Sequence, residues 1–293
     1  MGGRKNARIF RDTKVKKALI IGCGYLGQRV ALRLQALGLE VLGTTRSESR
    51  ARELQEAGIP SAVFELESAA DHPLLEQGWD TAVYAAAAGK DGDAELVFRD
   101  APLACHGLLG GELERFVQVS STGVYPQTAG EELDEESPAR PAGGRPALVR
   151  EAERRLLATG AGNALVIRLG GLYGPGRSPL DWLRRPGFRE RLRGGAEAWM
   201  NWIHIEDAAA AVCAAAAGGR GGEIYLAVDG NPVRRRDFYQ LAAELAGVEP
   251  PELDPDSADL GKRLSNHKLI EELGVDLVYP DYRSGLEAIS QAP

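Results

Sequence analysis

A glycine-rich turn is the first feature of the sequence that could carry chemistry. Its residues, Gly22–Gly27, read GCGYLG, directly after the apolar run Ala18–Ile21 and directly before apolar residues at helical spacing. In GxGxxG the first glycine permits a tight turn, the second admits a pyrophosphate, and the third lets the helix pack on the strand. The helix N-terminus adds free N–H groups and a positive dipole end. We therefore predict a dinucleotide site here. Its expected contacts are Gly22, Gly24, Tyr25, Leu26 and Gly27.

The end of the next predicted strand, Glu40–Thr45, indicates which dinucleotide fits. Sites for NAD usually place Asp or Glu there to bond the ribose 2′-hydroxyl. This sequence has Thr45, Arg46 and Ser47, with no acid before Glu48. Arg46 could pair with a 2′-phosphate, and Thr45 or Ser47 could hydrogen-bond it. The alternative is an exposed arginine at the start of a loop. We favour NADP(H) over NAD(H) as the cofactor.

Predicted strands and helices alternate through the first part of the chain. A helix from about Glu206 and a short strand at 223–228 continue the pattern later. This alternation predicts an α/β fold, a doubly wound parallel sheet with right-handed crossovers, the NAD(P)-binding Rossmann fold. The remaining predicted strands are Ala62–Phe64, Thr81–Ala87, Phe116–Ser120 and Ala164–Leu169.

The regular alternation stops after Gly174. Residues 176–203 are rich in Arg, Gly, Pro and Trp and show no clear periodicity. We expect residues 17–175 and 204–230 to form the Rossmann domain. Residues 176–203 and 231–293 would form a smaller substrate-binding unit over the carboxyl edge of the sheet. The basic segment 1–16 is predicted to be a disordered tail.

Composition narrows the classes of partner. The net charge of −7 argues against nucleic acid. No apolar run approaches the roughly 20 residues that cross a bilayer, so no membrane partner is expected. The three cysteines are scattered without metal-ligand spacing, and no export signal precedes them. We therefore expect no metal and a cytoplasmic location with reduced thiols. The partner that we expect beside the cofactor is a small-molecule substrate.

Four segments, in order, resemble the short-chain dehydrogenase/reductase superfamily. They read IIGCGYLG at 20–27, VSSTGVY at 119–125, RLGGLYGPG at 168–176 and NWIHIED at 201–207. More narrowly, the chain is similar to extended and atypical members of the NAD(P)-dependent epimerase/dehydratase family, from Lys17 to about Ile289. Homodimers built through two packed helices are common in that family, so the resemblance allows a homodimer.

The resemblance also implies roles for individual residues. Ser121 aligns with the active-site Ser or Thr that hydrogen-bonds the substrate oxygen during hydride transfer. The turn that contains Leu172 and Tyr173 would lie near the nicotinamide, although Tyr173 could simply pack there. Small residues after the fourth strand would line the adenosine and ribose region, and Leu66 would lie by the adenine; both could equally be core. The additional cofactor contacts are Leu66, Ala85, Ala86, Ala87, Ser120, Leu172 and Tyr173.

The usual catalytic pair of the family is absent. Its members carry a Tyr with a Lys four residues later, and no Tyr in this chain has a Lys at that distance. Alignment on Glu153 puts Arg145 at the Tyr position and Val149 at the Lys position, whereas alignment on Glu151 puts Gly143 and Ala147 there. Neither alignment contains the pair. Arg145 is a poor base because its guanidinium stays protonated. It could bind an anionic substrate or a cofactor phosphate, or lie on a surface helix.

Other residues could contribute to a non-standard active site. Tyr125 could act as an acid without a lysine, although the family uses this position mostly structurally. His204 titrates near neutrality, but it precedes a predicted helix and could cap it. Trp199 and Trp202 could line a substrate cavity. Arg177 would suit a phosphate or carboxylate, or belong to a solvated loop.

Three functions are compatible with these features. The first is an NADP(H)-dependent oxidoreductase or epimerase that acts on a polar, nucleotide-sugar-like substrate, with Ser121 polarising the substrate. The second is a non-catalytic NADP(H)-binding sensor or regulatory protein that has lost the Tyr/Lys pair. The third is binding of another dinucleotide such as FAD, since GxGxxG also occurs in flavin proteins.

Overall fold

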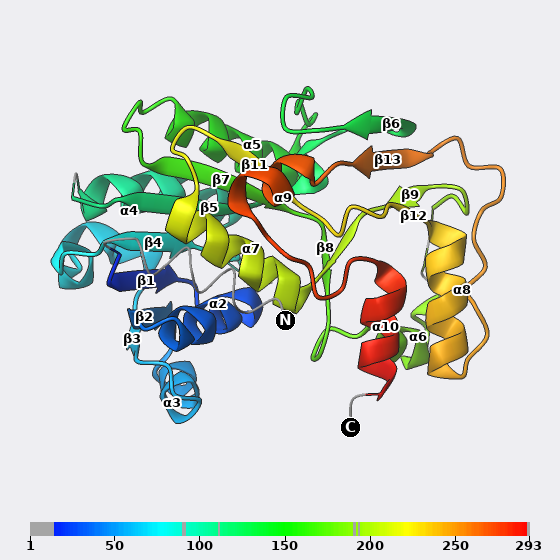
Figure 1. Ribbon diagram of the computed structural model, residues 1–293, viewed down its shortest axis with the longest axis horizontal. Helices are drawn as coiled ribbons and strands as arrows, with labels where there is room; N and C mark the ends of the chain where they lie inside the picture. The colour runs from blue at the N-terminus through cyan, green and yellow to red at the C-terminus, as the bar shows by residue number, and fades with distance from the viewer. Residues whose placement is uncertain (1–14, 90–91, 111, 190–191, 193, 292–293) are drawn as a thin grey trace.

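A seven-stranded parallel sheet forms the centre of the computed structural model, which describes residues 15–89, 92–110, 112–189, 192 and 194–291. The strand order is β11-β7-β5-β4-β1-β2-β3 (Figure 1). From β1 the chain first adds strands on one side, β2 and β3, and then on the other side, beginning with β4. Open α/β sheets bind their ligands at such a switch point, here between β1 and β4. The predicted doubly wound sheet is confirmed. Its strands are β1 (Lys17–Ile21), β2 (Glu40–Thr45), β3 (Ser61–Val63), β4 (Thr81–Tyr84), β5 (Arg115–Ser121), β7 (Ala164–Leu169) and β11 (Ile224–Ala227).

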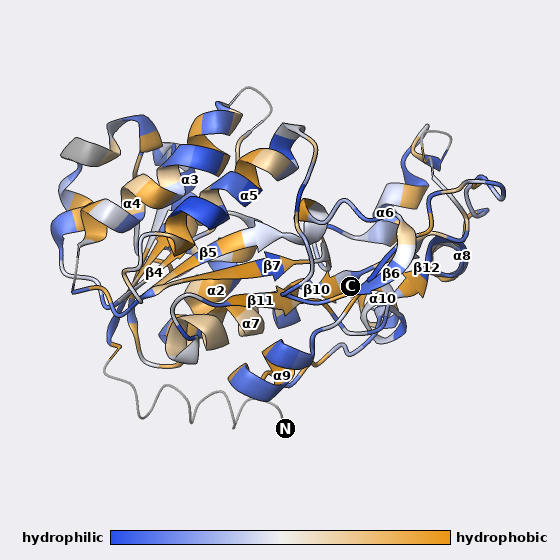
Figure 2. Ribbon diagram, turned by 90° about the horizontal axis from the view of Figure 1, so that it is seen from above, coloured by the Kyte–Doolittle hydropathy of each residue, from blue (hydrophilic) through white to orange (hydrophobic). Residues whose placement is uncertain are grey.

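Helices cover both faces of this sheet, and the side chains buried between the sheet and the helices are mostly apolar (Figure 2). On one face α2 (Tyr25–Ala36) and α7 (Ile205–Gly218) pack side by side, with α9 (His267–Leu273) beside them and α3 (Glu48–Glu56) near β3. On the other face lie α4 (Ala101–Leu109), which follows the π-turn η3 (Leu96–Asp100), and α5 (Gly144–Leu157).

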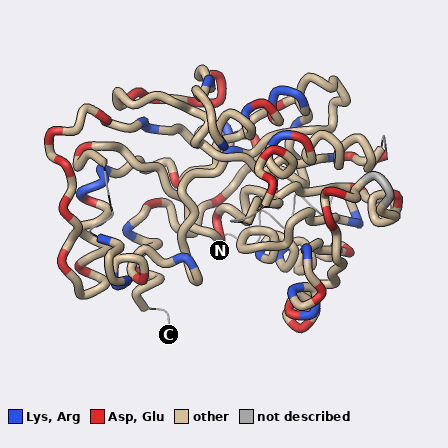
Figure 3. The backbone as a smooth tube through the Cα atoms, turned by 180° about the vertical axis from the view of Figure 1, so that it is seen from behind, with Lys and Arg blue, Asp and Glu red and all other residues tan. Residues whose placement is uncertain are grey.

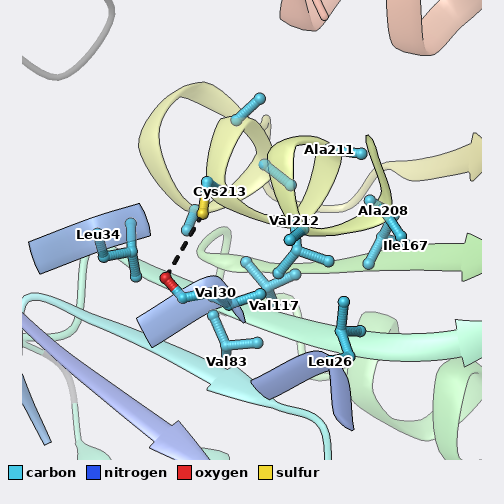
Figure 4. Close-up of a cluster of buried hydrophobic side chains, with 14 of the residues drawn as sticks. Leu26, Val30, Leu34, Val83, Val117, Ile167, Ala208, Ala211, Val212 and Cys213 are labelled. Carbon is cyan, nitrogen blue, oxygen red and sulfur yellow. Dashed lines mark hydrogen bonds between the residues drawn. The ribbon is translucent and has the colours of Figure 1, made fainter. Parts of the chain in front are cut away.

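Close packing between α2 and α7 depends on the alanines of α7. The small side chains of Ala208 and Ala211 bring the helix close to the sheet (Figure 4). The thiol of Cys213 lies 3.8 Å from the carbonyl oxygen of Val30 on α2. At the start of α7, Glu206 forms ion pairs with two arginines of α2 at 3.1 and 2.8 Å. The position of α7 is thus tied to that of α2.

A smaller unit stands beside the sheet. Here α6 (Pro179–Arg184), α8 (Arg235–Ala246) and α10 (Tyr282–Gln291) pack around Trp202, whose ring stacks 4.5 Å from that of Phe238. A four-stranded sheet, β12-β9-β13-β6, and the pair β8–β10 connect this unit to the main sheet. These strands are β6 (Ala129–Leu133), β8 (Gly171–Tyr173), β9 (Trp199–Met200), β10 (Trp202–His204), β12 (Val233–Arg234) and β13 (Gly261–Leu264).

Two elements cross the domain boundaries expected from the sequence. Strand β6 lies within the range assigned to the Rossmann domain, yet it pairs with β13 of the smaller unit. Helix α9 lies within the range assigned to the smaller unit, yet its Leu269 and Leu273 pack in the main core. In the described part of residues 176–203 the elements α6, β9 and β10 are short, which explains the lack of periodicity there.

The described chain begins with a residue that is packed against the sheet domain. Residues 1–14 of the predicted tail lie outside the described residues, whereas Val15 is buried and the Lys16 N–H donates to the Asp80 carboxylate at 2.6 Å. Among the residues that the structure describes, no helix is both long and apolar enough to cross a membrane. Acidic and basic side chains are interspersed along the chain (Figure 3).

Candidate functional site

The turn between β1 and α2 is fixed by two close backbone contacts. Gly22 has φ +91°, and a Cβ there would lie 2.5 Å from the backbone of Ala86, just after β4. A Cβ on Gly27 would lie 2.5 Å from the carbonyl oxygen of Gly22. With separations of this size, a side chain at either position would force the neighbouring backbone to shift. The two glycines therefore hold the start of α2 against the carboxyl ends of β1 and β4.

Gly24 faces open space instead. No atom lies within 4 Å of where its Cβ would be. Helix α2 begins at the next residue, Tyr25, without a side-chain cap and without an acidic residue in its first turn. The unsatisfied N–H groups and the positive dipole end are therefore left for an anion. This turn fits a dinucleotide pyrophosphate.

A cleft of about 530 Å³ runs from this turn along the carboxyl ends of the main sheet. That volume is in the range of small-molecule and cofactor sites. Most cofactor contacts predicted from the sequence line it. They are Gly22, Gly24, Tyr25, Leu26, Thr45, Arg46, Leu66, Ala85, Ala86, Ala87, Ser120 and Leu172.

Three predicted cofactor contacts lie outside the cleft lining. Gly27 packs beneath the turn, as described above. The Ser47 hydroxyl caps α3 by accepting the N–H of Arg50 at 3.3 Å. Tyr173 is fully buried, with its ring 5.8 Å from that of Trp202 and 5.4 Å from that of His204.

Positive charge gathers where β2 ends. Arg46 and Arg50 both line the cleft. Arg50 also pairs with Glu53 on α3, while Arg46 forms no ion pair with any residue that the structure describes. Sequence reasoning missed Arg50, although its position one helical turn beyond Arg46 was the available signal. This end of the cleft suits a phosphate group on the ribose.

Ser121 lies at the carboxyl end of β5 and is exposed to the cleft. Its Oγ accepts the N–H of Gly123 at 3.1 Å. Since that bond uses an oxygen lone pair, the hydroxyl proton remains available to a ligand oxygen. The neighbouring Ser120 hydroxyl instead donates to Glu153 at 2.5 Å.

A buried ion pair supports the wall behind these serines. Arg168 on β7 and Glu153 on α5 are almost wholly inaccessible, and their two N–O distances are 2.9 and 2.7 Å. Arg168 also donates to the Tyr125 hydroxyl at 2.6 Å, and that hydroxyl donates to the Asp134 carbonyl at 2.7 Å. Burial raises the pKa of Tyr125 to about 12. Tyr125 thus belongs to this buried network, outside the cleft lining.

Arg145 and Val149, which one of the two alignments puts at the positions of the missing pair, both line the cleft, whereas Gly143 and Ala147 do not. The Arg145 guanidinium lies 4.4 Å from the centre of the Phe98 ring, and that of Arg177 lies 4.5 Å from the centre of the Tyr25 ring. The described lining contains four arginines and no Asp, Glu, His or Lys.

The other three substrate candidates lie away from the cleft. His204 is buried, and its Nδ1 accepts the N–H of Glu206 at 3.3 Å, so it caps α7. Burial lowers the pKa of His204 to about 4, which keeps the ring neutral at physiological pH. Trp202 lies in the core of the smaller unit. The guanidinium groups of Arg234 and Arg263 lie 3.8 and 5.6 Å from the centre of the Trp199 ring.

Comparison with known proteins supports this reading of the fold and the motifs. Residues 18–227 match the NAD dependent epimerase/dehydratase family. Protein YeeZ of Escherichia coli K12 is 28% identical over 91% of this chain and 97% of its own length. A 4-hydroxy-2-methyl-3-oxo-4-farnesyl-3,4-dihydroquinoline-1-oxide ketoreductase of Stigmatella aurantiaca is 30% identical over 78% of this chain and 72% of its own. A conserved protein of unknown function from Silicibacter pomeroyi has a solved structure with a TM-score of 0.78 and 28% identity, covering 94% of this chain and 98% of its own.

Alanine at Gly24 and at Gly27 should separate binding from stability. For Gly24→Ala we expect little change in the free energy of unfolding, but about a tenfold or greater loss of affinity for the dinucleotide, because the methyl group fills the pyrophosphate's approach. For Gly27→Ala we expect the free energy of unfolding to fall by about 1–3 kcal/mol, because the added methyl group overpacks the contact with Gly22. Urea unfolding and a fluorescence titration with reduced nicotinamide nucleotide measure the two quantities. Unchanged nucleotide affinity in Gly24→Ala would exclude this turn as the pyrophosphate site.

Removal of Glu153 should test the buried ion pair. Glu153→Ala leaves the Arg168 charge buried without its carboxylate, so we expect the free energy of unfolding to fall by about 3–5 kcal/mol. Glu151→Ala is the matched control, because Glu151 forms an exposed pair with Arg154 on the same helix and should matter little. Equal effects of the two substitutions in urea unfolding would contradict a structural role for the buried pair.

Proposed function

The chain belongs to the NAD dependent epimerase/dehydratase family, which binds an NAD(P) nucleotide, and on that premise we propose an NADP(H)-dependent oxidoreductase or epimerase. Its substrate would be a polar, nucleotide-sugar-like molecule that carries a carbonyl or hydroxyl group. The observation that carries the choice of NADP(H) is the pair Arg46 and Arg50 at the end of β2, where no acidic residue lines the cleft. A carboxylate there would repel a 2′-phosphate, whereas guanidinium groups pair with it.

The same cleft offers a place for each part of the cofactor. The 2′-phosphate would lie at Arg46 and Thr45, and the pyrophosphate at the N-terminus of α2. Arg177 lies over the ring of Tyr25, the first residue of α2, and would close over the pyrophosphate. The nicotinamide would lie toward Ser121 and Leu172, and when bound it supplies or accepts a hydride.

Ser121 would orient and polarise the substrate oxygen through its available hydroxyl proton. The described lining offers no side chain that titrates near neutral pH to exchange a proton. Cys23 is buried, which raises its pKa to about 12, and burial also raises the pKa of Tyr25. We therefore propose that water supplies the proton. A relative named as a ketoreductase, 30% identical, supports carbonyl reduction as the reaction class.

A second candidate function is a non-catalytic NADP(H) sensor or regulatory protein. The absence of the family's Tyr/Lys pair favours this function, because no Tyr in the chain has a Lys four residues later. This reading needs the same cofactor site but no turnover.

The cofactor assignment is tested at Arg46. We expect wild-type protein to bind NADPH more tightly than NADH, and Arg46→Ala to weaken NADPH by about 10–100-fold while NADH is unaffected, since a charged hydrogen bond is lost only with the 2′-phosphate. Arg52→Ala, an exposed arginine of α3 that does not line the cleft, serves as the control. Isothermal titration calorimetry gives the six dissociation constants, for three proteins and two nucleotides. Equal affinity for both nucleotides, unaffected by Arg46→Ala, would overturn the proposal of NADP(H).

Turnover separates the two functions. Wild-type protein loaded with NADPH is mixed with a panel of ketones and nucleotide sugars, and loss of nicotinamide absorbance is followed, with Ser121→Ala as the matched variant. Turnover that falls about 100-fold or more in Ser121→Ala supports the enzyme. Tight NADPH binding with no hydride transfer to any compound, and a partner protein whose affinity differs between NADP⁺ and NADPH, would support the sensor.

A further inference from the structure

We propose that the substrate of this cleft carries an anionic oxygen group, a carboxylate or a phosphate, and that Arg145 binds it. This inference rests on the proposed NADP(H) function and extends it to the chemical class of the substrate. The charge of the cleft is opposite to that of the chain as a whole. The chain has a net charge of −7, yet the ionised side chains that line the described cleft are arginines alone. A cleft of one sign concentrates ligands of the opposite sign.

Three of these four arginines lie where the cofactor's phosphates would bind. Arg46 and Arg50 lie at the end of β2, beside the proposed 2′-phosphate position. Arg177 lies over Tyr25, beside the proposed pyrophosphate position. These positions account for all three phosphate groups of NADP(H). Arg145 comes from α5, which also carries Val149, and none of the proposed phosphate positions lies on that helix. Its charge therefore remains for the substrate.

Arg145 differs from the other arginines of α5. Arg150, Arg154 and Arg155 each pair with a carboxylate. Among the described residues, Arg145 pairs with none, and the first turn of α5 contains no acidic residue. The only partner that the structure gives its guanidinium is the ring of Phe98, at 4.4 Å from the ring centre. An aromatic ring engages the face of a guanidinium, and the N–H donors lie in its plane. Those donors are left for a ligand.

The chemistry of the substrate follows from this arrangement. A guanidinium binds carboxylate or phosphate through paired, charge-assisted hydrogen bonds. Ser121 lines the same cleft and can donate to the reacting oxygen. A single molecule would then need both a reacting carbonyl or hydroxyl and an anionic group. Oxo acids and sugar phosphates have this composition, and uncharged ketones do not.

Anion binding by NADPH-loaded protein tests the inference. Wild type, Arg145→Gln and Arg140→Gln are each saturated with NADPH, and inorganic phosphate or malonate is titrated by calorimetry at constant ionic strength in chloride. Arg140→Gln removes the same charge from an exposed residue outside the cleft lining. We expect both anions, or one of them, to bind wild type and Arg140→Gln alike and to bind Arg145→Gln about tenfold or more weakly. Arg145→Lys should restore part of the binding, because it restores the charge.

The NADPH dissociation constants of the three proteins separate this inference from the proposed function. Constants that agree within about twofold, with anion binding lost only in Arg145→Gln, support Arg145 as a substrate residue. Binding of phosphate without malonate assigns the phosphate class, and the reverse assigns the carboxylate class. No anion binding to NADPH-loaded wild type, or equal binding to Arg145→Gln, overturns the inference while leaving the cofactor site intact. Failure of wild type to bind NADPH overturns the proposed function, and with it the inference that rests on it.

Discussion

The close approach of Gly27 to Gly22, and of Gly22 to the backbone after β4, is the constraint on which the site depends. It sets where α2 starts and aims the N-terminus of that helix into the cleft. Helix α2 in turn positions α7, through the ion pairs of Glu206 and the packing of the buried alanines. Helix α7 contacts β10, which belongs to the pair of strands that connects to the smaller unit. The glycine turn, α2, α7 and the smaller unit are therefore linked through direct contacts.

Charge is arranged so that the cleft stays cationic in an acidic protein. The two carboxylates of α5 are already paired within the protein, Glu153 with the buried Arg168 and Glu151 with the exposed Arg154, and neither lines the cleft. The described lining offers guanidinium groups and no Asp, Glu, His or Lys. Guanidinium groups can bind anions but cannot exchange protons, which restricts the chemistry of the site to binding, orientation and polarisation by Ser121. That restriction is why an enzyme and a sensor are both compatible with the same cleft.

The sequence predicted those parts of the site that depend on neighbouring residues. The strand–turn–helix around Gly24 and the basic end of β2 are local patterns, and the structure brings them into one cleft. The sequence could not place side chains whose surroundings come from distant segments. Trp202 packs on Phe238, far along the chain, and Tyr125 is engaged by Arg168 from another strand. The pairing of β6 with β13, likewise, joins segments more than a hundred residues apart and leaves no periodic signal.

Phosphorus NMR of NADP⁺ added to the protein tests the central claim, that this cleft holds the cofactor through its phosphates. Arginines at the end of β2 favour the dianion of the 2′-phosphate, whose second pKa is about 6 when free. The account predicts that binding lowers this pKa well below the free value and shifts the pyrophosphate resonances as well. A 2′-phosphate that titrates as in free NADP⁺, while the pyrophosphate resonances shift, would contradict the role of Arg46 and Arg50.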